Sequence, residues 1–326
     1  MNKVKITRRP KLKNPHLIVA WPGMGDVAFR TAGFLIEKLG AKEFASIPSE
    51  DFFYLNGSIV QDGILDLPAP PTNKFYYWKN TRQGKDASDL IIFLSDAQPD
   101  LDFYDEYCET ILSAVKNYEV KTVICFAALP VPSDHTQDSE VLYCATDKKF
   151  SEELSAHKIK KLSSGQISGM NGLFLGLAKK KGYRGFCLLG EIPIYTIQIE
   201  NPKAAQALLE ALNKILGLSL DTHELKEQGR LIEDQINQLV DYLKPGSQHT
   251  PSPISEEEIE RIKKSLSEYS KLPQSIRAKI EELFQQSRKD ITKAGELKSE
   301  LDKWNIYKEY EDKFLDLFKK PGDKSN

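Results

Sequence analysis

The sequence lacks the features that mark several large classes of protein. Its 326 residues include only four cysteines, and no two of them form the closely spaced pair that zinc sites and redox centres use. No apolar run approaches the roughly 20 residues of a membrane-spanning helix, and the basic N-terminus precedes too short an apolar stretch for a signal peptide. Charge of one sign is not in excess either, since 45 Lys and Arg stand against 47 Asp and Glu. We therefore expect a cytoplasmic protein with no metal site, no membrane contact and no nucleic-acid partner.

The overall composition is that of a globular protein, with 40% hydrophobic and 28% charged residues. The charged fraction is uneven along the chain. It rises from about 23% in residues 1–220 to about 39% in residues 221–326. This change predicts a core domain over residues 1–220 and a C-terminal region over residues 221–326, with a proline-rich linker at about 244–254.

Residues 1–220 alternate short apolar runs with helix-like segments. The runs are typical of buried strands because they are short and rich in β-branched residues. Asn56-Gly57 lies between two apolar stretches within residues 52–60 and predicts a β-hairpin there. The order of elements predicts an α/β fold with a largely parallel sheet, covered by helices on both faces. Strands are expected at His16–Trp21, Phe44–Ile47, Phe75–Trp78, Asp89–Leu94, Val120–Phe126, Val141–Ala145 and Gly185–Leu189, and helices at Val27–Leu39, Asp102–Asn117, Gly169–Lys181 and Pro202–Leu216.

Residues 221–326 are predicted to be helical. Apolar residues from Leu225 to Leu243 recur every three or four positions, as on one stripe of a helix. Beyond the linker, a capping box at Ser255 begins a second helix. A stripe from Ile276 to Trp304 predicts one long helix, followed by a last one at Tyr307–Phe318. The α/β domain, another helix and a second subunit are the candidates for covering these apolar faces.

A glycine-bearing loop follows the first predicted strand. The segment Gly23–Ala28 fits the pattern G-x-G-x-x-A, which in dinucleotide-binding folds lets a pyrophosphate approach backbone N–H groups at a helix N-terminus. Here Asp26 stands where the phosphate charge belongs. We prefer the interpretation that the glycines allow a turn at positive φ and that Asp26 caps the next helix, so we expect no cofactor. The loop residues kept as candidates are Gly23, Met24, Gly25 and Asp26.

A second polar loop, Ser163–Gly172, precedes an apolar helix. Its hydroxyl groups and backbone N–H groups can cradle an anion. The same residues also suit a tight entry to a helix, with Ser168 as the N-cap and the glycines allowing close packing on the sheet. The candidate residues of this loop are Gly165, Gln166, Ser168, Gly169, Asn171 and Gly172.

Glu191 is a candidate of a different kind. It follows the predicted strand Gly185–Leu189, at the carboxyl edge where open α/β sheets bind ligands. It can act as a base or pair with Arg184 or a backbone N–H group. No Ser, Cys or His in a recognisable nucleophile motif accompanies it, and hydrolysis requires both a nucleophile and a base. We therefore assign no catalytic residue.

Four segments carry a further signal through their combination and order: Trp21–Ala28, Ser164–Leu173, Leu188–Glu191 and Asn201–Ala205 with Leu208 and Leu209. Together they resemble the proteasome assembly chaperone 2 family, which includes bacterial and archaeal members of unassigned role. The resemblance covers about residues 15–240. It implies a three-layer α/β fold of the phosphorylase/hydrolase type, self-association and, in eukaryotic relatives, a chaperone role on proteasome α-subunits. It does not imply the catalysis of the phosphorylases.

The leading hypothesis is thus a non-catalytic, assembly-chaperone-like protein that binds copies of itself and another protein. The alternative is an enzyme or sensor that binds a small molecule at the polar edge of the sheet. A third hypothesis makes the C-terminal helices a dimerisation or docking arm. The client, the number of copies and the role of residues 255–318 are not encoded in any motif.

Overall fold

The computed structural model describes residues 4–54, 57–61, 63–82, 87–243, 274–303 and 307–318. Contacts divide the chain into two compact units, residues 1–270 and 271–326, which we describe separately. The composition changes near residue 220, but the helix that follows, α6 (His223–Leu243), belongs to the first unit. Leu225 of α6 is buried in the same hydrophobic core as residues of α1 (Val27–Leu39) and α5 (Pro202–Leu216).

The first unit is built on a sheet that has nine strands within the described residues, in the order β1-β3-β6-β7-β2-β8-β11-β9-β10. Its four central strands, β7, β2, β8 and β11, are parallel. The pairs β1–β3, β3–β6, β6–β7 and β9–β11 are antiparallel, and β10 is parallel to β9. The strands are β1 (Lys5–Ile6), β2 (His16–Ala20), β3 (Lys42–Ser46), β6 (Asn73–Trp78), β7 (Leu90–Ser95), β8 (Thr122–Val131), β9 (Val141–Ala145), β10 (Lys160–Lys161) and β11 (Gly185–Pro193).

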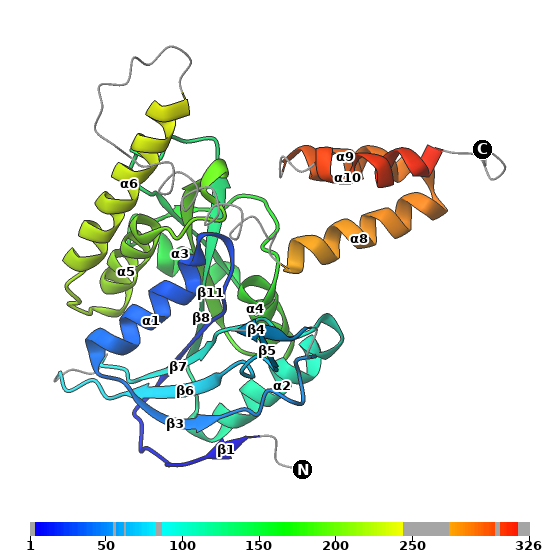
Figure 1. Cartoon of the computed structure of the whole chain (residues 1–326). Helices are drawn as coiled ribbons and strands as arrows, with labels where there is room; N and C mark the ends of the chain where they lie inside the picture. Colours follow the sequence, from blue (N-terminus) through cyan, green and yellow to red (C-terminus); the bar gives the residue numbers. More distant parts are fainter. Residues whose placement is uncertain are drawn as a thin grey trace. The chain divides into compact units, whose positions relative to one another are not determined.

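Helices cover both faces of this sheet (Figure 1). Side chains alternate across a strand, so Leu17 and Val19 of β2 enter one core with α2 (Tyr104–Val115) and α4 (Met170–Lys180). Ile18 and Ala20 enter the other core with α1, α5 and α3 (Lys148–Ser155). This arrangement confirms the predicted three-layer α/β fold, with the parallel strands at its centre.

Local signals explain the helix boundaries well. Helix α1 has the predicted bounds and ends at Gly40, whose φ of 60° suits a residue without a Cβ. Helix α5 begins at Pro202, where the missing N–H group needs no partner. The side chain of Asn201 caps α5 by accepting a hydrogen bond of 2.9 Å from the N–H of Ala204.

The hairpin turn predicted at Asn56-Gly57 includes residue 56, which lies outside the described residues. The structure has an antiparallel hairpin of strands β4 (Ile59–Gln61) and β5 (Ile64–Asp66), in which Gln61 pairs with Ile64. Gly63, just before β5, has a φ of 77°, which suits a residue without a Cβ.

Other elements differ in extent. Strands β8 and β11 run past their predicted ends because their parallel pairing continues to Val131 and Pro193. Strands β1 and β10 are too short, and α3 too polar, to have been predicted from periodicity.

The second unit contains three helices within its described residues: α8 (Gln274–Lys289), α9 (Ala294–Lys303) and α10 (Tyr307–Leu315). The predicted long helix is therefore two helices, separated at Asp290, whose carboxylate accepts hydrogen bonds from the N–H and hydroxyl of Thr292. Phe284 of α8 stacks on Tyr310 of α10, with ring centroids 5.8 Å apart. The predicted linker at 244–254 and the helix expected after Ser255 lie outside the described residues.

Within the described ranges, every helix is too short or too polar to span a bilayer.

Candidate functional site

The loops that carry the candidate residues lie at one edge of the sheet. Because β7, β2, β8 and β11 are parallel, their carboxyl ends share that edge. After β2 the chain turns towards β3 on one side of the sheet, whereas after β8 it continues to β9 and β11 on the other. Open α/β sheets commonly bind ligands at such a reversal. The Gly23–Asp26 loop follows β2 and therefore lies at this edge of the sheet.

Asn171 joins the two predicted loops. Its side chain accepts a hydrogen bond of 3.0 Å from the N–H of Trp21 and donates one of 2.9 Å to the carbonyl of Trp21. Both residues are buried. The amide of Asn171 thus satisfies a stretch of backbone that leaves β2 and would otherwise lose its hydrogen bonds inside the protein.

Gln98, which follows β7, makes a second link between these loops. Its side chain donates to the carbonyl of Pro22 at 2.8 Å and accepts from the N–H of Met170 at 3.1 Å. From the other side, the N–H of Gly25 donates to the carbonyl of Ile197, and the carbonyl of Gly25 accepts from the N–H of Asn201. Backbone groups that a phosphate would need at Gly25 are therefore engaged by the protein itself.

The glycines of these loops allow close packing. Gly25 has a φ of 59°, as predicted, but Gly23 is extended, with a φ of −170°. A Cβ on Gly172 would lie 2.4 Å from the carbonyl oxygen of Ile167, too close for any side chain. Gly169 has a φ of 71°, and a Cβ there would lie 2.7 Å from the side-chain oxygen of Gln98. These positions hold backbone segments in contact with each other.

The predicted helix caps are not formed. Asp26 precedes α1, but its φ of 48° is left-handed and its side chain accepts no capping hydrogen bond. Gly169, and not Ser168, occupies the N-cap position of α4, again without a side-chain bond. Gln166 is exposed, and Gly165 packs on the side chain of Leu162.

Asp26 lies in an unfavourable electrostatic setting. Burial raises the pKa of its carboxyl group, and the nearby Glu200 raises it further, whereas the Gly23 backbone and Arg30 oppose the shift. Arg30 itself pairs with Glu200 at 2.5 Å. A half-buried carboxylate in left-handed backbone is a strained position of the kind found at functional sites, which keeps Asp26 among the candidates.

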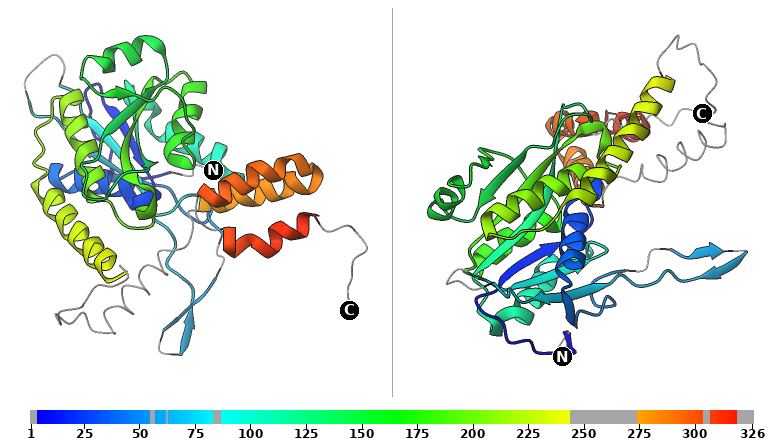
Figure 2. Two further views of the ribbon diagram at one scale, coloured as in Figure 1. Left: turned by 90° about the horizontal axis from the view of Figure 1, so that it is seen from above. Right: turned by 90° about the vertical axis from the view of Figure 1, so that its left-hand side faces the viewer.

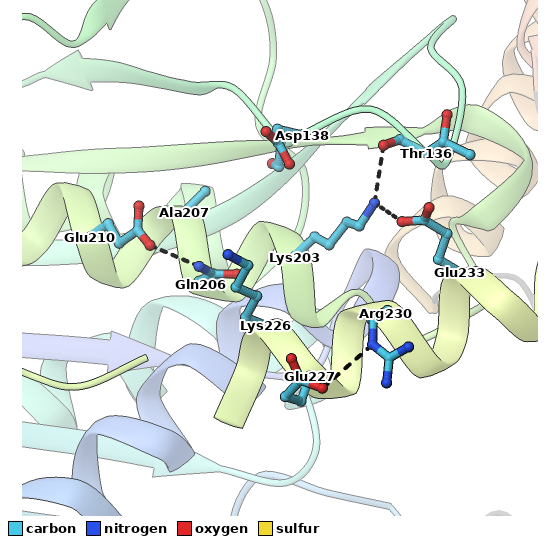
Figure 3. Close-up of a pocket in the computed structure, with 11 residues that line it drawn as sticks. Thr136, Asp138, Lys203, Gln206, Ala207, Glu210, Lys226, Glu227, Arg230 and Glu233 are labelled. Carbon is cyan, nitrogen blue, oxygen red and sulfur yellow. Dashed lines mark hydrogen bonds and ion pairs between the residues drawn. The ribbon is translucent and has the colours of Figure 1, made fainter. Parts of the chain in front are cut away.

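A polar pocket lies farther along the same unit, between α5, α6 and the loop 132–140 that follows β8 (Figure 3). Its volume is about 410 Å³. Lys203 of α5 projects between the loop and α6, where its ammonium group donates to the carbonyls of His135 and Thr136 and pairs with Glu233. Gly229 of α6 makes room for the aliphatic part of this lysine, since a Cβ there would lie 2.8 Å from Lys203 Cγ.

His135 is held at the rim of this region. Its Nδ1 lies 2.8 Å from the hydroxyl of Tyr195 and its Nε2 lies 2.9 Å from Oδ1 of Asn237 on α6. The backbone N–H of His135 also donates to the Tyr195 hydroxyl at 2.8 Å. A ring that donates from Nε2 and accepts at Nδ1 satisfies all three contacts. No local pattern in the sequence pointed to His135 or Lys203, although Lys203 lies in the segment Asn201–Ala205.

Glu191 lines a neighbouring pocket of about 290 Å³, together with His135, Asn201 and Lys203. Partial burial raises the pKa of Glu191, the adjacent Glu140 raises it further, and Lys160 lowers it. Asn171 thus links the loop after β2 to the loop before α4. Glu191 lies apart from this link, in a pocket beside β11, the strand next to β8. Among the described side chains, no group of three His, Cys, Asp or Glu is arranged to hold a metal ion.

The cysteines form a row on neighbouring strands. Cys187 pairs in register with Cys125 on one side and with Cys144 on the other. Cys125 and Cys187 are buried. Burial raises the pKa of Cys125 well above the usual range, and the hydrogen bond to Cys144, together with burial, does the same for Cys187. Cys144 is half-buried, and a hydrogen bond from Cys187 lowers its pKa to about 7.

Comparison with known proteins adds a second line of evidence. The model of the PAC2 family matches residues 17–240. The uncharacterized protein MJ1210 of Methanocaldococcus jannaschii is 27% identical over 241 residues, which cover 72% of this chain and 88% of that protein. The crystal structure of Pyrococcus furiosus PbaB, an archaeal proteasome activator, has a TM-score of 0.62 and 28% identity, covering 73% of this chain and 99% of PbaB. PbaA of the same organism, an archaeal homolog of proteasome-assembly chaperone, has a TM-score of 0.55 and 26% identity, covering 72% of this chain and 96% of PbaA.

Proposed function

The chain belongs to the PAC2 family, and on that premise we propose that it is a non-catalytic, assembly-chaperone-like protein that associates with itself and binds a proteasome component. The observation that carries this proposal is the extent of the match. The family model matches residues 17–240, which include nearly all of the four central strands and α1 to α5. The structural similarity in turn covers nearly all of PbaB and PbaA.

The geometry of the sheet edge supports a binding role without chemistry. At the carboxyl edge of the parallel strands, the side chain of Asn171 bonds the backbone of Trp21, and the side chain of Gln98 bonds the backbones of Pro22 and Met170. Loops that are linked in this way form a fixed surface that combines segments from several strands. Rigid loops on a packed scaffold suit recognition of a protein surface.

The proposal is tested by mixing the purified chain with proteasome α-subunits from the organism that encodes it. Analytical ultracentrifugation should detect a complex, and adding the chain should speed the appearance of assembled α-rings or of half-proteasomes. Heat-denatured chain is the control for non-specific effects. If no complex forms at micromolar concentrations of both proteins, and the assembly rate is unchanged, the proteasome component is not the partner.

A second candidate function rests on the pocket beside Glu191. A protonatable carboxyl group, the ammonium group of Lys203 and a histidine ring converge on a volume of about 290 Å³, which is near the lower size of small-molecule sites. A saturating ligand at 100 times its dissociation constant would stabilise the fold by about 2.7 kcal/mol. A thermal-shift screen of metabolites against the native chain and Glu191→Gln would reveal it. A hit that stabilises both proteins equally would place the ligand elsewhere.

A further inference from the structure

The hairpin of β4 and β5 is an unusually apolar projection. Its residues 57–67, which we call the arm, extend away from the sheet in both views of Figure 2. Pro68, Pro70 and Pro71 follow the arm and stiffen its return to the sheet, since proline restricts the backbone. Five large apolar side chains of the arm are between 52% and 68% exposed: Ile59, Val60, Ile64, Leu65 and Leu67.

Apolar side chains lie on both faces of the arm, and Asp66 shares the face of Ile59. Val60 lies opposite Leu65, so these two side chains share one face. Ile59 and Ile64 are each one residue away from that pair and therefore lie on the other face. A two-stranded sheet is marginally stable in water unless something packs against it. The arm thus has the character of a surface that is covered in the working protein.

The area of the arm is sufficient for one side of a stable contact. Five side chains that each expose roughly 120 Å² amount to on the order of 600 Å², compared with about 800 Å² per partner in a standard protein interface. An apolar surface of this size requires a constant partner, because transient exposure favours aggregation.

The charges of the arm and of the N-terminal segment are complementary. The arm, residues 57–67, contains two acidic residues and no Lys or Arg. Residues 5–13 contain five basic residues and no Asp or Glu. Opposite potentials of this kind steer and align two surfaces.

The basic segment also lies on an open strand edge. Strand β1 is the last strand of the sheet on its side and pairs with β3 alone among the described residues. Lys5, Arg8, Arg9 and Lys11 are exposed along this segment, and Ile6 adds an exposed apolar side chain. An open edge can accept a further strand from another chain.

We propose that the arm of one copy packs on the basic edge segment, residues 5–13, of a second copy. A single chain carries both surfaces and leaves both exposed, and another copy is the one partner always made in equal amount. The contact joins two different surfaces, so it is heterologous and links copies head to tail. This inference rests on the self-association in the proposed function and names the surfaces that produce it.

The test uses two variants of the full chain and two matched controls. The arm variant is V60D/L65D, and the edge variant is R8E/R9E. The controls make the same chemical changes at exposed positions elsewhere, L231D on α6 and K179E/K180E on α4. Because all of these side chains are exposed or half-exposed in the single chain, circular dichroism should show each variant folded.

Sedimentation equilibrium of each protein alone gives the first result. The wild type and both controls should form assemblies of several chains. The arm variant should dissociate at concentrations at least about 100-fold higher, because two buried apolar side chains are replaced by charges. The edge variant should dissociate similarly, and the wild-type assembly should weaken as salt is raised.

A mixing experiment identifies the contact. The arm variant keeps an intact edge and the edge variant keeps an intact arm, so an equimolar mixture should form two-chain complexes that neither variant forms alone. Failure of the mixture to associate, or an arm variant that assembles like the wild type, overturns the inference. A monomeric wild type that still binds α-subunits through the arm also overturns it, in favour of the client as occupant. If the wild type assembles but binds no α-subunit, this inference holds and the proteasome component is not the partner.

Discussion

Replacing Asn171 by alanine should destabilise the first unit strongly. The substitution removes the two hydrogen bonds to the backbone of Trp21 and leaves a buried N–H and a buried carbonyl without partners. Each such group costs about 1–3 kcal/mol. We therefore expect a loss of about 2–6 kcal/mol, a large part of the 5–15 kcal/mol that stabilises a typical protein. The corresponding fall in melting temperature is roughly 5–20 °C.

The chain supplies a matched control for this prediction. Asn213 also bonds both backbone groups of one residue, donating to the carbonyl of Leu220 at 3.1 Å and accepting from its N–H at 3.3 Å. There the site is half-buried, so water can replace the lost partner. We expect Asn213→Ala to cost about 0.5–1.5 kcal/mol.

Urea unfolding, followed by far-ultraviolet circular dichroism and by tryptophan fluorescence, measures both variants. The midpoint of Asn171→Ala should lie well below that of Asn213→Ala, with similar slopes. Equal urea midpoints would refute the reasoning, because burial of the two Asn171 hydrogen bonds would then add nothing to the stability of the fold. Asn171 would in that case remain a candidate ligand-binding residue.

Three further predictions concern single side chains. Cys144 should react with iodoacetamide at pH 7.5 before the other three cysteines, because its pKa is lowered to about 7. Burial raises the pKa values of Cys108 and Cys125, and the hydrogen bond to Cys144, with burial, raises that of Cys187. Peptide mass spectrometry would reveal the order of labelling, and fast labelling that persists in Cys144→Ser would contradict the prediction. Asp26→Asn should melt at a higher temperature than the wild type at pH 7. Because the pKa of Asp26 is raised in the folded protein, folding favours the protonated carboxyl group. The stabilising contribution of Asp26 is therefore complete below the ordinary pKa near 3.8 and is lost as the pH rises through the folded pKa. If the difference in melting temperature between Asp26→Asn and the wild type does not shrink at pH 3, it has another cause. Lys203→Met keeps the packing against Gly229 but leaves Glu233 without its ion pair. Amide hydrogen exchange in α6 should therefore become faster, while exchange in α4 stays the same. Unaltered exchange in α6 would show that the buried side chain of Leu225 holds α6 in place without the ion pair.

Membership of the PAC2 family and the hydrogen-bonded loops at the edge of the sheet point to the same kind of function. A loop region whose polar groups bond to one another has few left to bind a metabolite tightly, whereas it can present a fixed shape to another protein. The pocket beside Glu191 is the exception, because Lys203 and His135 lie there with volume to spare. Binding of proteasome α-subunits tests the first role, and the thermal-shift screen with Glu191→Gln tests the second.

Local patterns in the chain were enough to predict most of the elements. Helix α1 has its predicted bounds because its apolar stripe begins after the Gly23–Asp26 loop and its last turn is followed by Gly40, a residue suited to left-handed backbone. The apolar run at His16 predicted β2 because a strand buried on both faces needs no polar alternation. These signals depend on neighbours within a few residues, and such neighbours can be read from a single sequence.

The pairing of distant groups needed the assembled fold. Asn171 and Trp21 are 150 positions apart, and no periodicity relates them. They meet because β2 ends and α4 begins at the same edge of the sheet. Lys203 joins His135 and Glu233 for the same kind of reason, since α5 and α6 pack beside the loop after β8. The hairpin shows the same limit: both Asn56-Gly57 and Asp62-Gly63 favour a turn by local sequence, and only the fold gives the register in which Gln61 pairs with Ile64.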